Sequence, residues 1–263
     1  MQNVIAVAQS GMVALNKKLL ALTNDISNAQ TVGYKSKRVD FAEIYSQLVK
    51  DADQQYELEG TAPQGEAYGM GVRVSGTLMD MSPGTIQTTE NAYDLAIQGD
   101  GFFQVRMSNG DLAYTRAGNF RLDNNHQLVT PQGYAVEPSI TVPQNAVDVT
   151  IDTEGRIFVT LDGSSQAQQL GQISLAKFTN PEGLLSVGDN LFMPTDASGE
   201  ARVGFASHDG FGDVAQFSLE NSNVDVVARL AELVLLQRNF DLVTRAITAQ
   251  NNMLQSAIQV AQA

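Results

Sequence analysis

The chain has 263 residues, 43% of them hydrophobic, and it contains no cysteine. That hydrophobic fraction is enough to form a buried core, and the lack of cysteine excludes disulfides, thiolate nucleophiles and cysteine-bound metals. The formal net charge of −13 argues against nucleic acid or an anionic membrane surface as a partner, because both bind cationic surfaces.

The charge is unevenly distributed along the chain. Residues 1–38 carry a net charge of +4 and residues 221–263 a net charge of 0, which leaves −17 for residues 39–220. No apolar run approaches the roughly twenty residues of a membrane-spanning helix, and the first three residues lack the basic start of a signal peptide. We therefore expect no direct membrane insertion and no cleaved signal peptide.

The first predicted element is a helix near the N-terminus. Its apolar residues follow one another in alternating steps of three and four, as on the a/d face of a coiled coil. We expect the helix to end between Asn28 and Gly33, where polar side chains compete for backbone hydrogen bonds and a glycine can adopt a left-handed conformation. Together with Ala8 and Ala29, the residues of this predicted assembly seam are Ile5, Met12, Leu15, Leu19, Leu22 and Ile26.

Residues 36–92 are predicted to be a β-rich linking region, in which residues 50–66 form an acidic, exposed loop. From Tyr93 to about Met193 the apolar residues recur with a period of two and turns are frequent, which predicts an all-β domain of short antiparallel strands. The clearest hairpin joins strands at 102–107 and 112–116 through an Asn-Gly turn. A last strand is predicted near residues 170–178.

The last predicted element is one long helix between Asn221 and Ala263. At roughly 60 Å it needs a partner along its length, because isolated helices are marginal in water. We expect that partner to be the N-terminal helix, although both helices could instead cover a globular core. The seam residues of this helix stand seven apart: Val226, Leu233, Phe240, Ile247 and Leu254.

These elements predict an α+β protein in three parts. The terminal helices, in residues 1–35 and 221–263, are expected to pair as a coiled-coil-like domain. Residues 36–92 and 200–220 are expected to form the extended linking region, and residues 93–199 the all-β middle domain.

No catalytic, cofactor or metal site is predicted. The two histidines, His126 and His208, lie in predicted turns or glycine-rich connections and are expected to be surface residues. The pair Gly99 and Gly101 lacks the third glycine and the helix of a dinucleotide fingerprint. We therefore expect a protein that is not an enzyme and has no cofactor.

Three segments carry a resemblance to a known family. Residues 24–35 resemble the N-terminal signature of bacterial flagellar rod and hook proteins, although Asp25 and Val32 depart from its usual residues. Residues 94–105 and 114–120 resemble the middle domain of rod proteins, and residues 219–227 resemble their C-terminal motif. The matching residues are Asn24, Asn28, Gly33, Tyr34, Lys35, Gly99, Gly101, Phe102, Phe103, Asn221, Ser222, Asn223 and Val224.

The resemblance covers nearly the whole chain and is strongest to the distal member of the rod. It implies a self-assembling helical tube that spans the periplasm, transmits torque to the hook and conducts exported subunits. The implied partners are further copies of the chain, proximal rod proteins, the hook or a junction with it, surrounding ring proteins and the type III export apparatus, which exports such subunits uncleaved.

The C-terminal helix has no charged side chain after Arg245, and we take Asn251, Gln255 and Gln262 as candidate residues lining the channel of such a tube. Two alternatives remain open. One is a proximal rod or hook-like protein of the same family. The other is a periplasmic β-domain binding protein or enzyme with a coiled-coil stem.

Overall fold

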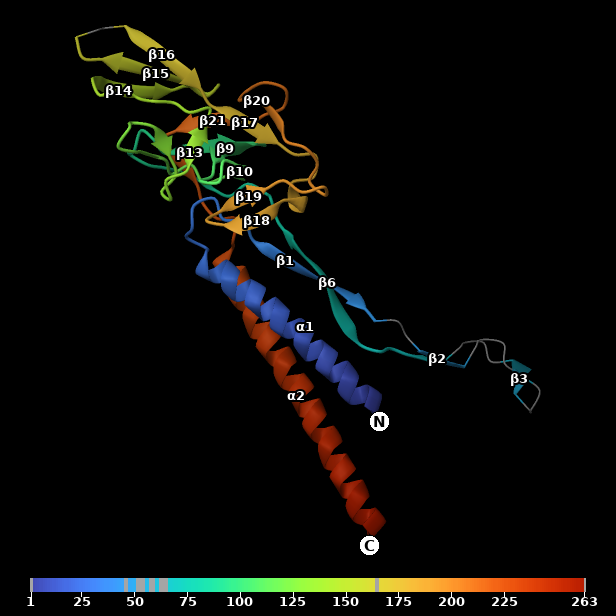
Figure 1. The fold of residues 1–263 in the computed structure, drawn as a ribbon. Helices are drawn as coiled ribbons and strands as arrows, with labels where there is room; N and C mark the ends of the chain where they lie inside the picture. The colour runs from blue at the N-terminus through green and yellow to red at the C-terminus, as the bar shows by residue number, and fades with distance from the viewer. Residues whose placement is uncertain are drawn as a thin grey trace. The chain divides into compact units, whose positions relative to one another are not determined.

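The computed structural model describes residues 2–44, 47–50, 55–56, 60–61, 66–163 and 166–262. One helix stands near each end of the chain and β-strands lie between them in sequence (Figure 1), so the predicted α+β class is confirmed. The chain forms two compact units. The first comprises residues 1–26, 37–78 and 225–263, and the second comprises residues 27–36 and 79–224. The three-part division stays a prediction.

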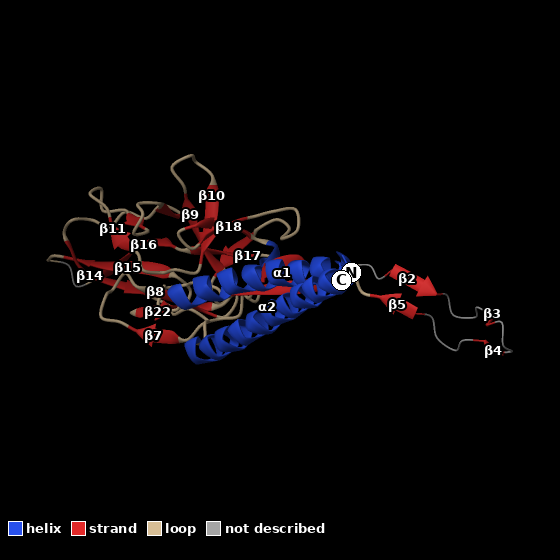
Figure 2. Cartoon of the chain, turned by 90° about the horizontal axis from the view of Figure 1, so that it is seen from below, coloured by secondary structure: helices blue, strands red, loops and turns tan. Residues whose placement is uncertain are grey.

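The first unit contains the two helices, α1 (Gln2–Ser27) and α2 (Val226–Gln262). Both views show them running in opposite directions (Figures 1 and 2). Asp225 begins α2 as an N-cap, because its Oδ1 accepts hydrogen bonds from the N–H groups of Val227 at 3.0 Å and Ala228 at 3.1 Å. Within the described residues, neither helix is apolar enough over a sufficient length to cross a membrane.

The remaining elements of the first unit are short paired strands. Strand β1 (Lys37–Glu43) pairs with β6 (Val72–Met79), which extends to the boundary of the unit. Strand β2 (Gln47–Lys50) pairs with β5 (Glu66–Tyr68), and β3 (Gln55–Tyr56) pairs with β4 (Gly60–Thr61). Most of the predicted acidic loop at 50–66 lies outside the described residues.

The second unit is built on a nine-stranded sheet with the path β11-β12-β13-β9-β10-β19-β18, in which β17 also pairs with β9 and β20. A three-stranded sheet β14-β15-β16 and the pairs β21-β8 and β22-β7 complete it. The strands are β7 (Ile86–Thr88), β8 (Leu95–Gln98), β9 (Phe102–Arg106), β10 (Leu112–Thr115), β11 (Arg121–Leu122), β12 (Leu128–Val129), β13 (Ala135–Glu137), β14 (Ala146–Ile151), β15 (Arg156–Leu161), β16 (Ala167–Gln172), β17 (Ser174–Lys177), β18 (Leu185–Gly188), β19 (Leu191–Met193), β20 (Arg202–Phe205), β21 (Asp213–Gln216) and β22 (Ser218–Glu220).

Two neighbouring phenylalanines on β9 divide the interior of this unit. Successive side chains of a strand point to opposite faces, so Phe102 and Phe103 enter different hydrophobic clusters. Phe103 packs edge-on against Phe120 with ring centroids 5.1 Å apart. Phe102 packs edge-on against Phe178 at 5.8 Å. The Gly-Phe-Phe motif therefore anchors both cores.

The hairpin between β9 and β10 is confirmed, with Leu112 opposite Arg106. The single strand predicted near residues 170–178 is wrong. The structure has two strands there, and β16 pairs with β15 whereas β17 pairs with β9 and β20. They separate at Ile173, which is fully buried and donates its N–H to the Gly155 carbonyl. Because Ile173 is apolar, it did not interrupt the period-two pattern of the sequence, and no boundary between the two strands could be predicted there.

Candidate functional site at the junction of the signature segments

The three signature segments meet at the carboxylate of Glu220 in the second unit. The Lys35 ammonium lies 2.6 Å from Glu220 Oε1, and the Gly84 N–H donates to the same oxygen at 2.9 Å. Arg116 Nη1 donates to Glu220 Oε2 at 3.4 Å. Lys35 also donates to the Ser82 carbonyl at 2.7 Å. The site is therefore a buried, hydrogen-bonded ionic cluster that joins four segments of chain.

Burial dominates the electrostatics of this cluster. It lowers the pKa of Lys35 below its ordinary value of 10.5, and the adjacent Glu220 carboxylate opposes that shift. Burial likewise lowers the pKa of Arg116, again opposed by Glu220. Arg116 gains two further interactions, since Nη2 donates to the Gly99 carbonyl at 2.8 Å and the guanidinium carbon lies 5.2 Å from the Phe102 ring centroid. Each charge depends on its partners, because an unpaired buried charge is strongly unfavourable.

The backbone of the N-terminal signature approaches the middle motif too closely for any side chain at Gly33. This residue has φ of 69°, and a Cβ added there would lie 2.5 Å from the backbone nitrogen of Ala117. Its N–H donates to the Glu220 carbonyl at 2.8 Å. Glycine is therefore required here both by the left-handed conformation and by the close approach.

The C-terminal motif is joined to the same region through amide side chains. Asn223 Oδ1 accepts from the Ser36 N–H at 2.8 Å, and its Nδ2 donates to the Asp80 carbonyl at 2.8 Å. The Asn221 N–H donates to the Thr85 carbonyl at 2.9 Å. The middle motif and both flanking signatures thus form one hydrogen-bonded junction.

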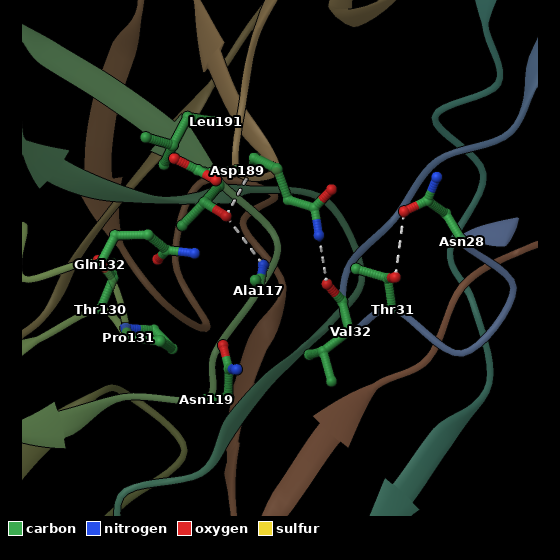
Figure 3. Close-up of a pocket in the computed structure, with 12 residues that line it drawn as sticks. Asn28, Thr31, Val32, Ala117, Asn119, Thr130, Pro131, Gln132, Asp189 and Leu191 are labelled. Carbon is green, nitrogen blue, oxygen red and sulfur yellow. Dashed lines mark hydrogen bonds between the residues drawn. The ribbon is translucent and has the colours of Figure 1, made fainter. Parts of the chain in front are cut away.

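A cavity of about 350 Å³ lies beside this junction (Figure 3). Asn190 Nδ2 donates to the Val32 carbonyl at 2.9 Å, and Thr115 Oγ1 donates to the Asn190 carbonyl at 2.8 Å. The first bond attaches the turn between β18 and β19 to the N-terminal signature, and the second attaches it to β10 in the middle motif. The cavity is lined by Asn28, Thr31, Val32, Thr115, Ala117, Asn119, Thr130, Pro131, Gln132, Asp189, Asn190 and Leu191.

The junction brings together most of the signature residues expected from the sequence. Tyr34, Lys35, Phe102, Phe103 and Ser222 are buried within the second unit. Gly101 lines a further cavity, Val224 of the C-terminal motif is half-buried, and Asn24 is exposed on α1 of the first unit. Among the described residues, no group of three or more potential metal-binding side chains is gathered in one place.

Two ion pairs join the helices of the first unit. The Lys18 ammonium lies 2.6 Å from Glu232, and Arg229 lies 3.5 Å from Asp25. The Asp25 carboxylate is fully buried and also accepts the N–H of Lys37 at 3.1 Å. The aspartate that departs from the usual signature therefore has a specific partner on α2.

The predicted seam residues differ in burial. Leu22 is buried, whereas Ile5 and Val226 are exposed. A groove of about 340 Å³ is lined by residues of both helices, including Leu15, Leu19, Leu236 and Phe240, of which Leu236 is buried. Met12, Ile26, Leu233 and Ile247 are half-buried, Asn251 and Gln255 are exposed, and the side chains of Leu254 and Gln262 lie outside the described part.

Sequence reasoning missed the two residues that complete the ionic cluster, Arg116 and Glu220. Both residues lie within the signature segments 114–120 and 219–227, but the sequence did not predict a role for either of them. The available signal was the charge of each residue among uncharged neighbours, Arg116 between Thr115 and Ala117 and Glu220 after Leu219. Such charges need a buried partner, but a single sequence does not show which partner.

Two family models match the middle and the C-terminal part of the chain. Residues 96–159 match the family model described as flagellar hook protein FlgE/F/G D1 domain, and residues 215–260 match the model described as flagellar basal body rod FlgEFG protein C-terminal.

Relatives match over nearly the whole chain. A flagellar basal-body rod protein FlgG of Caulobacter vibrioides is 40% identical, covering 97% of this chain and 98% of the relative. The proteins of the same name from Borreliella burgdorferi and Bacillus subtilis are each 35% identical, covering 97% and 95% of this chain and 97% and 96% of their own lengths. The chain therefore belongs to the FlgG family of flagellar basal-body rod proteins, the structural subunits of the distal rod.

Proposed function

We propose that the chain polymerises with copies of itself into a hollow helical tube that transmits torque to the hook and conducts exported subunits. In this tube α1 and α2 pair as a coiled-coil-like layer. The same proposal includes contacts with proximal rod proteins, the hook or its junction, the surrounding ring proteins and the export apparatus. Family membership supports assembly with other rod and hook components.

The observation that carries the proposal is the uncovered apolar surface of α2. This helix has 37 residues and α1 has 26, which correspond to about 55 Å and about 39 Å at 1.5 Å per residue. Helix α1 is therefore too short to cover α2 along its full length.

Helix α2 also carries a second apolar stripe, distinct from the predicted seam. Its members recur at helical spacing and are all exposed, with Leu242 at 64% and Val260 at 79%. Apolar residues gathered on one exposed face indicate a protein interface. We call this surface the outer stripe, and it consists of Leu235, Leu242, Ala246, Ala249, Met253 and Val260.

A further copy of the chain is the partner that fits the outer stripe. A subunit that contacts its neighbours through two different faces of one helix makes heterologous contacts, and such contacts generate open helical filaments when they do not close into a ring. The part of the predicted seam that α1 is too short to cover and the outer stripe are two such faces, so one subunit can contact both neighbours.

Leu242→Asp tests the proposal. The substitution puts a charge into the outer stripe, where burial in a polymer is strongly unfavourable, so the purified chain should no longer form filaments visible by electron microscopy. Thr248→Asp is the matched control, because Thr248 is exposed on the same helix and stands one heptad after the native Asp241. The control should polymerise as the unmodified chain does. Normal filaments from Leu242→Asp would refute the assigned interface.

A further inference from the structure

A small cavity of the second unit is lined by two basic side chains. Its volume is about 210 Å³, and its wall includes Arg116, Lys177 and Asp100 together with the aromatic rings of Phe102 and Phe178. Pockets for drug-sized ligands measure roughly 300–1,000 Å³. This cavity is therefore suited to one small chemical group.

Arg116 has more hydrogen-bond donors than partners. A guanidinium carries five N–H donors, but the described residues provide acceptors only at the Gly99 carbonyl and, at the long distance of 3.4 Å, at Glu220. The Nε atom is buried and has no partner among the described residues. The Glu220 carboxylate also accepts hydrogen bonds from Lys35 and Gly84, so it does not satisfy the remaining donors of Arg116.

Lys177 supplies a second cation on the same wall. Its ammonium donates to Asp100 Oδ2 at 2.7 Å and to the Gly210 carbonyl at 3.2 Å. One of its three N–H donors is therefore left to bind a further acceptor. The side chains of Asp100 and Lys177 are 70% and 36% exposed, whereas Arg116 is buried. The wall therefore combines a buried cation with a cation that solvent can reach. Of the two carboxylates that contact these cations, Asp100 lines the cavity, whereas Glu220 is not among its lining residues.

We propose that this cavity binds a carboxylate group between Arg116 and Lys177. A carboxylate matches the planar fork of a guanidinium and accepts charge-assisted hydrogen bonds from both cations. The group can come from a small free carboxylate or from an acidic side chain of a second copy of the chain. The second source rests on the self-assembly proposed above, and the net charge of −17 in residues 39–220 makes acidic side chains abundant in every copy.

The first arm of the test uses the full-length monomer and does not depend on assembly. Amide NMR signals of Gly101 and Thr179 are followed while sodium glutarate is added, with sodium chloride at equal ionic strength as the reference. We expect saturable shifts with glutarate, and at least tenfold weaker binding in Lys177→Gln. Arg121→Gln, which removes an exposed cation elsewhere in the same sheet, should bind as the unmodified chain does.

The second arm identifies the source of the carboxylate. Because the chain has no cysteine, Thr179→Cys places a single thiol at the cavity. If a neighbouring copy fills the cavity, alkylation should be at least tenfold slower in filaments than in monomer, and Lys177→Gln should remove that protection. Glutarate binding without protection in filaments assigns the cavity to a free carboxylate.

The two proposals fail in different ways. A chain that binds glutarate but forms no filaments would contradict self-assembly and leave the carboxylate site intact. The carboxylate site is overturned if glutarate gives no saturable shifts and filaments give no protection, or if Lys177→Gln behaves as the unmodified chain in both arms.

Discussion

Lys35 and Glu220 are 185 residues apart in the chain, yet the Lys35 ammonium lies 2.6 Å from the Glu220 carboxylate and both side chains are excluded from solvent. Lys35 follows α1 in the sequence and Glu220 precedes α2. The ion pair therefore holds together, within the second unit, the two segments that lead to the helices. The proposed transmission of torque needs such a fixed point, because force applied at either terminus has to reach the rest of the chain.

Glu220→Gln should strongly destabilise the second unit. The substitution keeps the side-chain shape but leaves Lys35 and Arg116 buried without a carboxylate, and breaking a buried pair in this way costs about 3–5 kcal/mol. Urea unfolding followed by amide NMR signals of β9 and β10 measures the loss. Glu137→Gln is the control, because Glu137 pairs with Arg106 at 3.1 Å in a partly exposed position, where a pair contributes about 0–1 kcal/mol. Equal losses in the two variants would show that the cluster is not the anchor.

Gly33→Ala should destabilise the second unit more than Gly110→Ala. Both glycines have positive φ, 69° and 89°, and an alanine in that conformation costs about 1–2 kcal/mol. At Gly110 an added Cβ meets nothing within 4 Å, whereas at Gly33 it meets the Ala117 backbone. The difference between the losses of unfolding free energy in Gly33→Ala and Gly110→Ala measures the cost of the steric clash with the Ala117 backbone. Equal losses of unfolding free energy in the two variants would mean that the N-terminal signature segment moves away from Ala117 at no cost in free energy.

The link between the helices should weaken in acid. A hydrogen bond from Lys18, opposed by burial and assisted by Arg229, holds the pKa of Glu232 below its ordinary value of 4.5. A carboxyl group with a lowered folded-state pKa stabilises the folded state above its unfolded pKa, here about 4.5, and loses that contribution as the pH falls through the folded pKa.

Comparison of the unmodified chain with Glu232→Gln measures this contribution. The groups that face Glu232 are Lys18 and Arg229, and Arg229 also contacts Asp25. We expect the two proteins to differ in helix stability, measured by circular dichroism during urea unfolding, at pH 7 and to differ less at pH 3, which lies below the unfolded pKa. A difference of the same size at both values would exclude Glu232 as the responsible group.

Gln255→Lys tests the channel lining predicted from the sequence. Gln255 is exposed on α2, in the segment without charged side chains, and a ring of lysines there should retain acidic polypeptides by electrostatic attraction. Later flagellar subunits should be exported more slowly through complete rods of this variant, while Gln255→Asn should have no effect. Unchanged export rates through Gln255→Lys rods would place Gln255 away from the channel.

The sequence predicts the elements of this fold better than it predicts their partners. Heptad spacing located α1 and α2, and the Asn-Gly turn located the hairpin of β9 and β10, because both signals are local. The split of residues 167–177 into β16 and β17 was missed, since their separation depends on distant strands. The partnership of Lys35 with Glu220 was missed for the same reason, as one sequence does not record contacts across 185 positions.

Hydrogen exchange on α2, compared between monomer and filament, tests whether the chain assembles through the outer stripe. If the outer stripe is covered by a second copy, amides from Leu242 to Val260 should exchange rapidly in the monomer and at least tenfold more slowly in filaments, because isolated helical segments open readily and packed ones do not. Exchange in this segment that is equally slow in both forms, or equally fast in both, would contradict assembly through this face of α2.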